Sequence, residues 1–423
     1  MAKSRAQVEW FSQRKLGLFL HFGLYAIEAW HEQDQMRRRI PRDEYGKLIK
    51  RFNPTQFNAD RILDLAESIG MEYVCLTTKH HDGFCLWNTR ETSFNAMHTP
   101  YGRDLVRQLA DACHRRNFPL GLYYSIVDWH HPNYPNQGRH HELPRPLPGD
   151  TPDWHKYMAF LTRQVRELCT NYGEVRHFFW DMNVPEHRDP AINALLRQLQ
   201  PNIVINDRGF DDGDFGTPER DEGKDQTDRQ IRFERPTEAC NSVGTQSWGY
   251  RRDEDYYSTA FLIESIDAML AKGGHYLLNV GPDADGNVPA QARQILDEIG
   301  AWYRKSREAF ADAEPATQLT TNRNVLLTRR DKSLYVHIPA PARADAIVLP
   351  PIAQQPLRAT LLNTGQPLPT TTGILPMYWE SQTRVLTIRQ LPRNLLAGET
   401  LIVRLDFASP LSENAPAITG FTG

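Results

Sequence analysis

The sequence has no long apolar run and no excess of charge of either sign. No stretch approaches about 18 consecutive apolar residues, the length of a membrane-spanning helix, and the mean hydropathy is −0.58. Lysine and arginine number 49 against 52 aspartates and glutamates, which gives a net charge of −3 and a pI near 6.6. Nucleic-acid binders carry a basic surface. We therefore expect neither a membrane nor a nucleic acid as a partner.

Cysteine is scarce, and its spacing forms no recognisable pairs. The five cysteines are an odd number, and no two make a Cys-x-x-Cys motif, so a disulfide framework is not expected. Residues 1–9 contain no apolar segment of the kind found in secretory signals. Together these absences predict a cytoplasmic protein, with a periplasmic or secreted one as the alternative if a signal segment has been removed.

The first three-quarters of the chain alternates short apolar runs with amphipathic helical patterns. Such repeats indicate parallel strands joined by helical crossovers, and no glycine-rich phosphate loop follows the first run, which argues against a dinucleotide-binding fold. We predict an α/β fold, an irregular (β/α)8-like TIM barrel over residues 1–314. The predicted strands are 16–22, 73–78, 120–126, 175–181, 203–206 and 276–280, with a seventh around 238–243. The predicted helices are 58–70, 103–116, 158–171, 191–199, 258–271 and 289–304.

The texture of the sequence changes beyond Pro315. Six short strand-like runs follow between proline, asparagine and glycine breaks, which predicts a C-terminal antiparallel β-sandwich over residues 315–423. Two loops of the first part are long: residues 132–152 carry six prolines, and residues 210–229 are rich in Asp, Glu and Gly. Both are expected to be solvated loops, although loops of this length often form walls of a site.

Polar residues end almost every predicted strand of the barrel. Because the carboxyl ends of barrel strands face one shared mouth, these side chains are expected to meet there. A single histidine or aspartate at a strand end is usually a turn cap, so the inference depends on the whole set. The set is His21, His80-His81-Asp82, Asp128-Trp129-His130-His131, Asp181, Asp207-Arg208 and Asn279.

The mixture of carboxylates, imidazoles and aromatic rings suits a sugar, which needs directional partners for its hydroxyls and an apolar surface for its ring face. Glycoside hydrolysis needs two carboxyl groups across the scissile bond. Asp181 is the strongest first candidate, because it abruptly follows the apolar run 177–180. Glu219 and Glu238 compete for the second role, and either could instead be an exposed loop acid.

Metal binding is the rival use of the histidines. A zinc-binding barrel hydrolase commonly has His-x-His on one strand, whereas this chain has the adjacent pairs His80-His81 and His130-His131. Neighbours on an extended strand point to opposite faces, so one imidazole of each pair should miss a common ion. We expect neither a metal nor another cofactor.

Four stretches of the sequence carry a family resemblance. They are residues 15–25 (KLGLFLHFGLY), 76–87 (LTTKHHDGFCLW), 121–125 (GLYYS) followed by 128–130 (DWH), and 277–282 (LLNVGP). With these motifs in order, the chain from Trp10 to Arg304 resembles the α-L-fucosidases of glycoside hydrolase family 29. That family also has a β-sandwich tail.

The resemblance implies roles for particular residues. Asp181 resembles the family's nucleophile. The family does not fix the position of the acid/base, for which Glu219 is the preferred candidate and Glu238 the alternative. Glu32 matches a sugar-binding glutamate, although the family usually has Trp next and this chain has Gln33. The other implied sugar-binding residues are His21, His80, His81, Tyr124, Arg208 and Trp248.

The resulting hypothesis is a retaining exo-α-L-fucosidase that acts on a fucosylated oligosaccharide or glycoside through a covalent glycosyl-enzyme intermediate. Two alternatives come from other classes. One is a non-catalytic carbohydrate-binding protein on a hydrolase scaffold, against which the retained Asp181 argues. The other is a metal-dependent barrel hydrolase.

Overall fold

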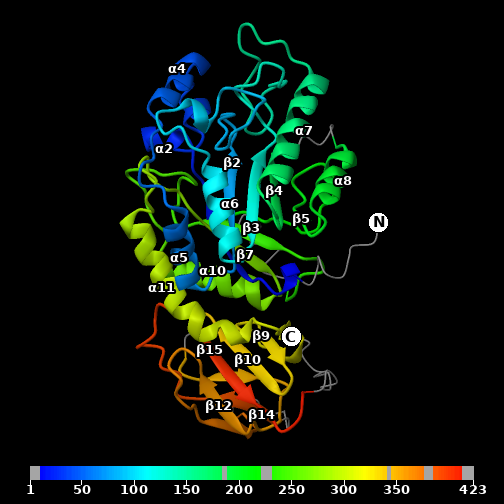
Figure 1. Cartoon of the computed structure of the whole chain (residues 1–423). Helices are drawn as coiled ribbons and strands as arrows, with labels where there is room; N and C mark the ends of the chain where they lie inside the picture. The colour runs from blue at the N-terminus through cyan, green and yellow to red at the C-terminus, as the bar shows by residue number, and fades with distance from the viewer. Residues whose placement is uncertain (1–9, 183–187, 221–230, 341–343, 376–383, 412–423) are drawn as a thin grey trace. The chain divides into compact units, whose positions relative to one another are not determined.

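The computed structural model describes residues 10–182, 188–220, 231–340, 344–375 and 384–411 (Figure 1). The chain forms two compact units, of which the first contains residues 1–220, 235–257 and 276–296 and the second the remainder. The predicted domain boundary between residues 314 and 315 stays a prediction.

A seven-stranded sheet forms the centre of the first unit, with the order β5-β4-β3-β2-β1-β7-β6. Strands β2 and β7 pair with β1 on its two sides, and both run parallel to it. The pairs from β2 to β5 are parallel as well. All seven predicted strands are present, including the seventh. Their bounds are β1 Leu16–Leu20, β2 Tyr73–Lys79, β3 Leu120–Ser125, β4 His177–Asp181, β5 Val204–Ile205, β6 Glu238–Ser242 and β7 His275–Val280.

An irregular segment, residues 215–219, occupies the eighth position of the barrel. Isolated parallel bridges join Phe215 to Asn206 just after β5, and Gly216 and Glu219 to Thr237 and Cys240 of the β6 region. The segment therefore links the two edges of the curled sheet. The expectation that residues 210–229 form a solvated loop is wrong for this part, and residues 221–229 lie outside the described residues.

The helices follow the capping signals of the sequence. The side chain of Asn58 accepts from the backbone N–H of Arg61 at 2.9 Å at the start of α5, and Gly70 ends that helix in the left-handed region at φ 94°. Asp153 caps α7, which therefore begins earlier than the predicted residue 158. The long helices are α5 Ala59–Ile69, α6 Leu105–Arg115, α7 Trp154–Asn171, α8 Pro190–Leu199, α10 Thr259–Ala271 and α11 Ala290–Ser306. The short ones are α2 Tyr25–Glu28, α3 Asp34–Arg37, α4 Arg42–Gly46, η1 Lys47–Lys50, η2 Ala96–His98, η4 Arg307–Ala309 and η5 Thr317–Leu319.

The barrel strands are buried on both faces, and their side chains alternate between the interior and the helix layer. Phe19, Tyr123 and Phe179 pack together inside the barrel with Tyr73, Cys75, Cys240 and Leu277. Their sequence neighbours on the same strands, such as Tyr124 and Trp180, therefore point outward. This alternation decides which side chains can reach the mouth of the barrel.

The second unit contains two antiparallel sheets, with the orders β12-β15-β10-β9-β8 and β11-β14-β13. A shared core of buried aliphatic side chains, such as Leu334, Val336 and Val403, lies between them. The antiparallel sandwich is thus as predicted. Its strands are β8 Glu314–Pro315, β9 Leu326–Arg330, β10 Ser333–Ile338, β11 Ile347–Leu349, β12 Arg358–Leu361, β13 Thr370–Gly373, β14 Val385–Ile388 and β15 Leu401–Asp406.

Two further expectations concern the whole chain. In the described ranges, no helix combines the length and apolar character needed to cross a membrane. All five cysteines are buried and free. The cytoplasmic location stays a prediction.

Candidate active site

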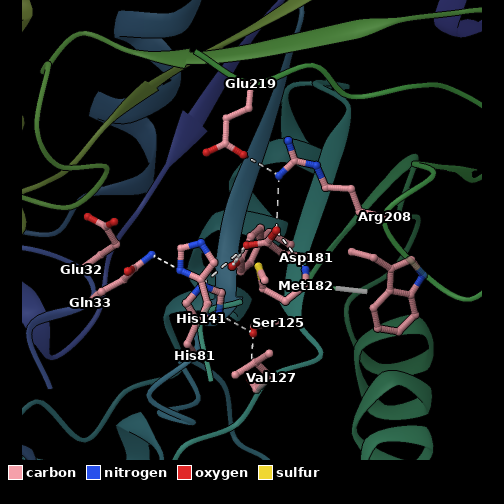
Figure 2. A network of polar contacts seen from close by, with 12 residues as sticks. Glu32, Gln33, His81, Ser125, Val127, His141, Asp181, Met182, Arg208 and Glu219 are labelled. Carbon is pink, nitrogen blue, oxygen red and sulfur yellow. Dashed lines mark hydrogen bonds and ion pairs between the residues drawn. The ribbon is translucent and has the colours of Figure 1, made fainter. Parts of the chain in front are cut away.

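The ends of the barrel strands bring the predicted polar residues together at one mouth. Asp181 ends β4, His21 follows β1 and His81 follows β2. Arg208 comes from the loop after β5, and Asn279 lies near the end of β7. Figure 2 shows Asp181 between the imidazoles of His81 and His141 on one side and Arg208 and Glu219 on the other.

The carboxylate of Asp181 is held by three neighbours. Tyr123 donates its hydroxyl proton to Oδ2 at 2.7 Å, and the backbone N–H of Met182 donates to Oδ1 at 3.0 Å. Arg208 Nη1 lies 3.3 Å from Oδ1. Burial alone would raise the pKa of Asp181, but its polar neighbours, among them the Arg208 guanidinium and the Tyr123 hydroxyl, outweigh this effect and lower that pKa. The carboxylate is therefore kept charged, as a nucleophile requires.

Arg208 joins the two predicted catalytic carboxylates. The same nitrogen that contacts Asp181, Nη1, lies 2.7 Å from Glu219 Oε2. Nε and Nη2 of Arg208 donate to the side chain and backbone oxygens of Thr217, at 3.1 and 2.9 Å. Asp181 Oδ1 and Glu219 Oε2 lie 3.3 and 2.7 Å from the same nitrogen, so the distance between these two oxygens cannot exceed the sum of the two contacts. That limit is compatible with the roughly 5–5.5 Å between the carboxyl groups of retaining glycosidases.

Glu238 does not reach this group. Its side chain is fully buried, with Oε2 accepting from the Tyr73 hydroxyl at 2.5 Å and Oε1 3.0 Å from His177 Nε2. Glu238 begins β6 and His177 begins β4, so both lie toward the amino ends of the strands, away from the mouth. The side chain of Glu219, by contrast, is 36% exposed. The structure thus corrects the alternative assignment of the acid/base to Glu238.

The tyrosine assignment is also corrected. Tyr124 points outward, where its hydroxyl donates to Gln164 of α7 at 2.6 Å. Tyr123 points inward to Asp181. The motif at 121–125 contains both tyrosines, and only the alternation of the strand distinguishes them.

His21 and His81 each have an unprotonated ring nitrogen at the mouth of the barrel. Asn279 donates through Nδ2 to the Trp248 carbonyl at 2.7 Å, so its Oδ1, 2.7 Å from His21 Nδ1, accepts a proton from the ring. The Ser125 hydroxyl donates to the Val127 carbonyl at 2.8 Å, so its oxygen accepts from His81 Nδ1 at 2.7 Å. In both neutral rings, Nε2 is consequently the acceptor.

Burial keeps these imidazoles neutral. It lowers the pKa of His21 to about 4 and that of His81 to about 3, and it also lowers the pKa of His80. His81 Nε2 lies 3.9 Å from Asp181 Oδ2, too far for a direct hydrogen bond. These unprotonated nitrogens can accept hydrogen bonds, and a sugar hydroxyl can donate one.

The expectation that His80 and His81 point to opposite faces is wrong. Strand β2 ends at Lys79, so both histidines lie beyond the extended backbone, and their ring centroids are 4.0 Å apart. Even so, no group of three or more metal-ligating His, Cys, Asp or Glu side chains occurs among the residues that the structure describes.

Glu32 and Trp248 form another wall of the site. Glu32 Oε2 accepts from the Ser247 hydroxyl and the Trp248 backbone N–H, each at 2.8 Å. The Trp248 ring lies 5.2 Å from that of His21, measured between centroids, and the Arg220 guanidinium lies 4.6 Å from the Trp248 ring centroid. By binding Ser247 and Trp248, Glu32 therefore positions the loop that carries the Trp248 ring.

Sequence reasoning missed four residues of this region: Tyr123, Ser125, Gln33 and His141. Tyr123 and Ser125 share the inward phase of β3 with one another, which the burial of the whole strand conceals. Gln33 and His141 come from loops and carry no periodic signal, and their contact could not be predicted from the sequence.

A parallel (β/α) barrel whose mouth holds two carboxylates on one guanidinium, among neutral imidazoles and aromatic rings, belongs to the class of glycoside hydrolases. The sequence profile described as Alpha-L-fucosidase matches residues 1–308. The chain therefore belongs to the α-L-fucosidase family.

Individual relatives agree with this assignment. The chain is 27% identical over 389 residues to the tissue alpha-L-fucosidase of Bos taurus, covering 86% of this chain and 82% of the relative. Among solved structures, it is similar to alpha-L-fucosidase isoenzyme 1 from Paenibacillus thiaminolyticus, with 30% identity, a TM-score of 0.82 and coverage of 95% and 98% of the two chains. An alpha-L-fucosidase from Vibrio sp. strain EJY3 gives 25% identity and a TM-score of 0.84, covering 97% of this chain and 74% of the other.

Proposed function

We propose that the protein is a retaining exo-α-L-fucosidase that releases terminal L-fucose from fucosylated oligosaccharides or glycosides. Asp181 is its nucleophile and Glu219 its acid/base. The observation that carries this proposal is the contact of both carboxylates with Arg208 Nη1. This contact sets the two groups at a spacing compatible with double displacement.

In the first step, Asp181 attacks the anomeric carbon, and the bond from that carbon to the leaving oxygen breaks. Glu219 gives its proton to that oxygen, and a fucosyl ester on Asp181 results. In the second step, Glu219 takes a proton from water as the water oxygen attacks the same carbon. The ester bond breaks, and fucose leaves with its original configuration. Arg208 touches both carboxylates and so stabilises each when it is charged.

Azide rescue tests both assignments on an aryl α-L-fucoside with a good leaving group. Glu219→Ala should lose most turnover and regain it with azide, giving the α-fucosyl azide because two displacements occur. Asp181→Gly should instead give the β-azide by a single displacement. Glu238→Ala is the matched control for the acid/base, and its turnover should not respond to azide. Rescue of Glu238→Ala with none in Glu219→Ala would refute the assignment.

The two other classes are separated by simple measurements. A carbohydrate-binding protein would bind the aryl fucoside without releasing fucose. A metal-dependent hydrolase would contain a stoichiometric metal by elemental analysis and would lose activity in a chelator. We expect fucose release that a chelator leaves unchanged.

A further inference from the structure

His141 reaches the active site from the long proline-rich loop between β3 and α7. Its backbone carbonyl accepts from the indole N–H of Trp129 at 2.8 Å. Its ring lies 5.5 Å from that of His81, measured between centroids. Figure 2 shows the His141 ring beside His81, with Gln33 on its other side. The loop thus forms a wall of the site, and His141 is the side chain that it contributes next to His81.

The hydrogen bonds of His141 have a determined direction. Arg37 Nε, which can only donate, lies 3.0 Å from Gln33 Oε1. This contact orients the Gln33 amide, so its Nε2 faces His141 Nδ1 at 2.6 Å. An amide nitrogen only donates, and His141 Nδ1 must therefore accept. The proton of the neutral ring is consequently on Nε2.

His141 is neutral under ordinary conditions. Burial, together with the neighbouring His140, lowers its pKa to about 4. Its Nε2–H is therefore a neutral donor. His81, whose Nδ1 proton goes to Ser125, offers a bare Nε2. Two adjacent imidazoles thus present opposite hydrogen-bonding character.

We propose that His141 is a specificity-determining residue, whose Nε2–H donates to the oxygen of the same sugar hydroxyl that donates its proton to His81 Nε2. A hydroxyl is both donor and acceptor, so this pair matches it and rejects a group that can only accept or only donate. At 5.5 Å between centroids, one oxygen can lie about 2.7–3.2 Å from a nitrogen of each ring. Gln33 is the positioning residue that holds this tautomer. The inference rests on the proposed function, because the hydroxyl belongs to the fucose of the substrate.

The tautomer can be measured without turnover. Side-chain ¹⁵N NMR of the full-length protein should show His141 as the neutral Nε2–H form. In Gln33→Glu, the carboxylate can only accept, so the His141 proton should move to Nδ1 or the ring should become charged. An Nδ1–H form in the wild type, or no change in Gln33→Glu, would overturn the assignment of Gln33.

The substrate contact is tested with aryl α-L-fucoside and its monodeoxy analogues. His141→Phe should lower kcat/KM for the parent about 10- to 100-fold and have little effect on the one analogue that lacks the recognised hydroxyl. His141→Gln, which retains an N–H donor, should recover part of the loss. His155→Phe is the matched control, since it makes the same change at an exposed residue of α7 outside the site, and its kcat/KM should equal that of the wild type.

The possible failures are distinguishable. Equal losses on every analogue, or no loss on the parent, would overturn the role of His141 while the wild type still releases fucose. If the wild type releases no fucose from the parent, the proposed function fails. The NMR result then still decides the tautomer of His141.

Discussion

Replacing Tyr123 with phenylalanine tests how the charge on Asp181 is maintained. The substitution removes one hydroxyl, which donates to Asp181 Oδ2 at 2.7 Å, and keeps the ring in the barrel interior. This hydrogen bond lowers the pKa of Asp181, because it stabilises the charged carboxylate. Its loss should therefore raise that pKa, and the acid limb of kcat/KM should move to higher pH.

The size of this movement follows from the type of bond. A hydrogen bond to a charged group contributes about 1.5–3 kcal/mol, and one pH unit corresponds to about 1.36 kcal/mol. The acid limb should thus move upward by about one to two units. The assay is kcat/KM for an aryl α-L-fucoside across the acid range, which reports ionisations of the free enzyme.

Tyr124→Phe is the matched control, because it makes the same change at the next residue of the same strand. Its hydroxyl bonds Gln164 and not Asp181. The acid limb should stay in place, while the free energy of unfolding should fall by about 1–3 kcal/mol, since a buried acceptor is left unpaired. An unmoved limb in Tyr123→Phe, or an equal movement in both variants, would refute the reasoning.

Three other predictions concern stability. Lys79→Met leaves Asp128 buried without the ammonium that lies 2.7 Å away and should lower the free energy of unfolding, measured in urea, by about 3–5 kcal/mol. A loss below about 1 kcal/mol, which is typical of an exposed ion pair, would contradict this. Burial raises the pKa of Asp82 to about 7. Between about pH 4 and 7, the folded state therefore keeps a proton on Asp82 that the unfolded state has released. The free energy of unfolding consequently falls as the pH rises through that window. The free energy of unfolding of Asp82→Asn, relative to that of the wild type, should accordingly increase from pH 4 to 8 by up to roughly 4 kcal/mol. A difference that does not change with pH would exclude the raised pKa. Leu405→Ala removes a fully buried side chain of β15 and should cost about 2–5 kcal/mol, measured by thermal or urea unfolding, whereas a variant as stable as the wild type would contradict the packing of this core.

The sequence by itself determined the class of the fold and most of the strand ends. Alternating apolar runs and capped amphipathic helices are local patterns, and each arises from contacts within one element. The positions of Asp181, His21 and Arg208 at the mouth followed from one rule, that the carboxyl ends of barrel strands meet. Motif resemblance then supplied the family, while the acid/base stayed open between Glu219 and Glu238.

Only the tertiary structure decided between neighbours and between loops. A strand buried on both faces shows no polar alternation, so the sequence could not say whether Tyr123 or Tyr124 faces inward. Glu219 and Glu238 were separated by their depth in the barrel, which depends on strand register and on the bridges of residues 215–219.

The contact of Gln33 with His141 joins residues 108 positions apart in two loops. Local patterns carry no information on such a pair, because its geometry depends on how the barrel positions both loops at its mouth.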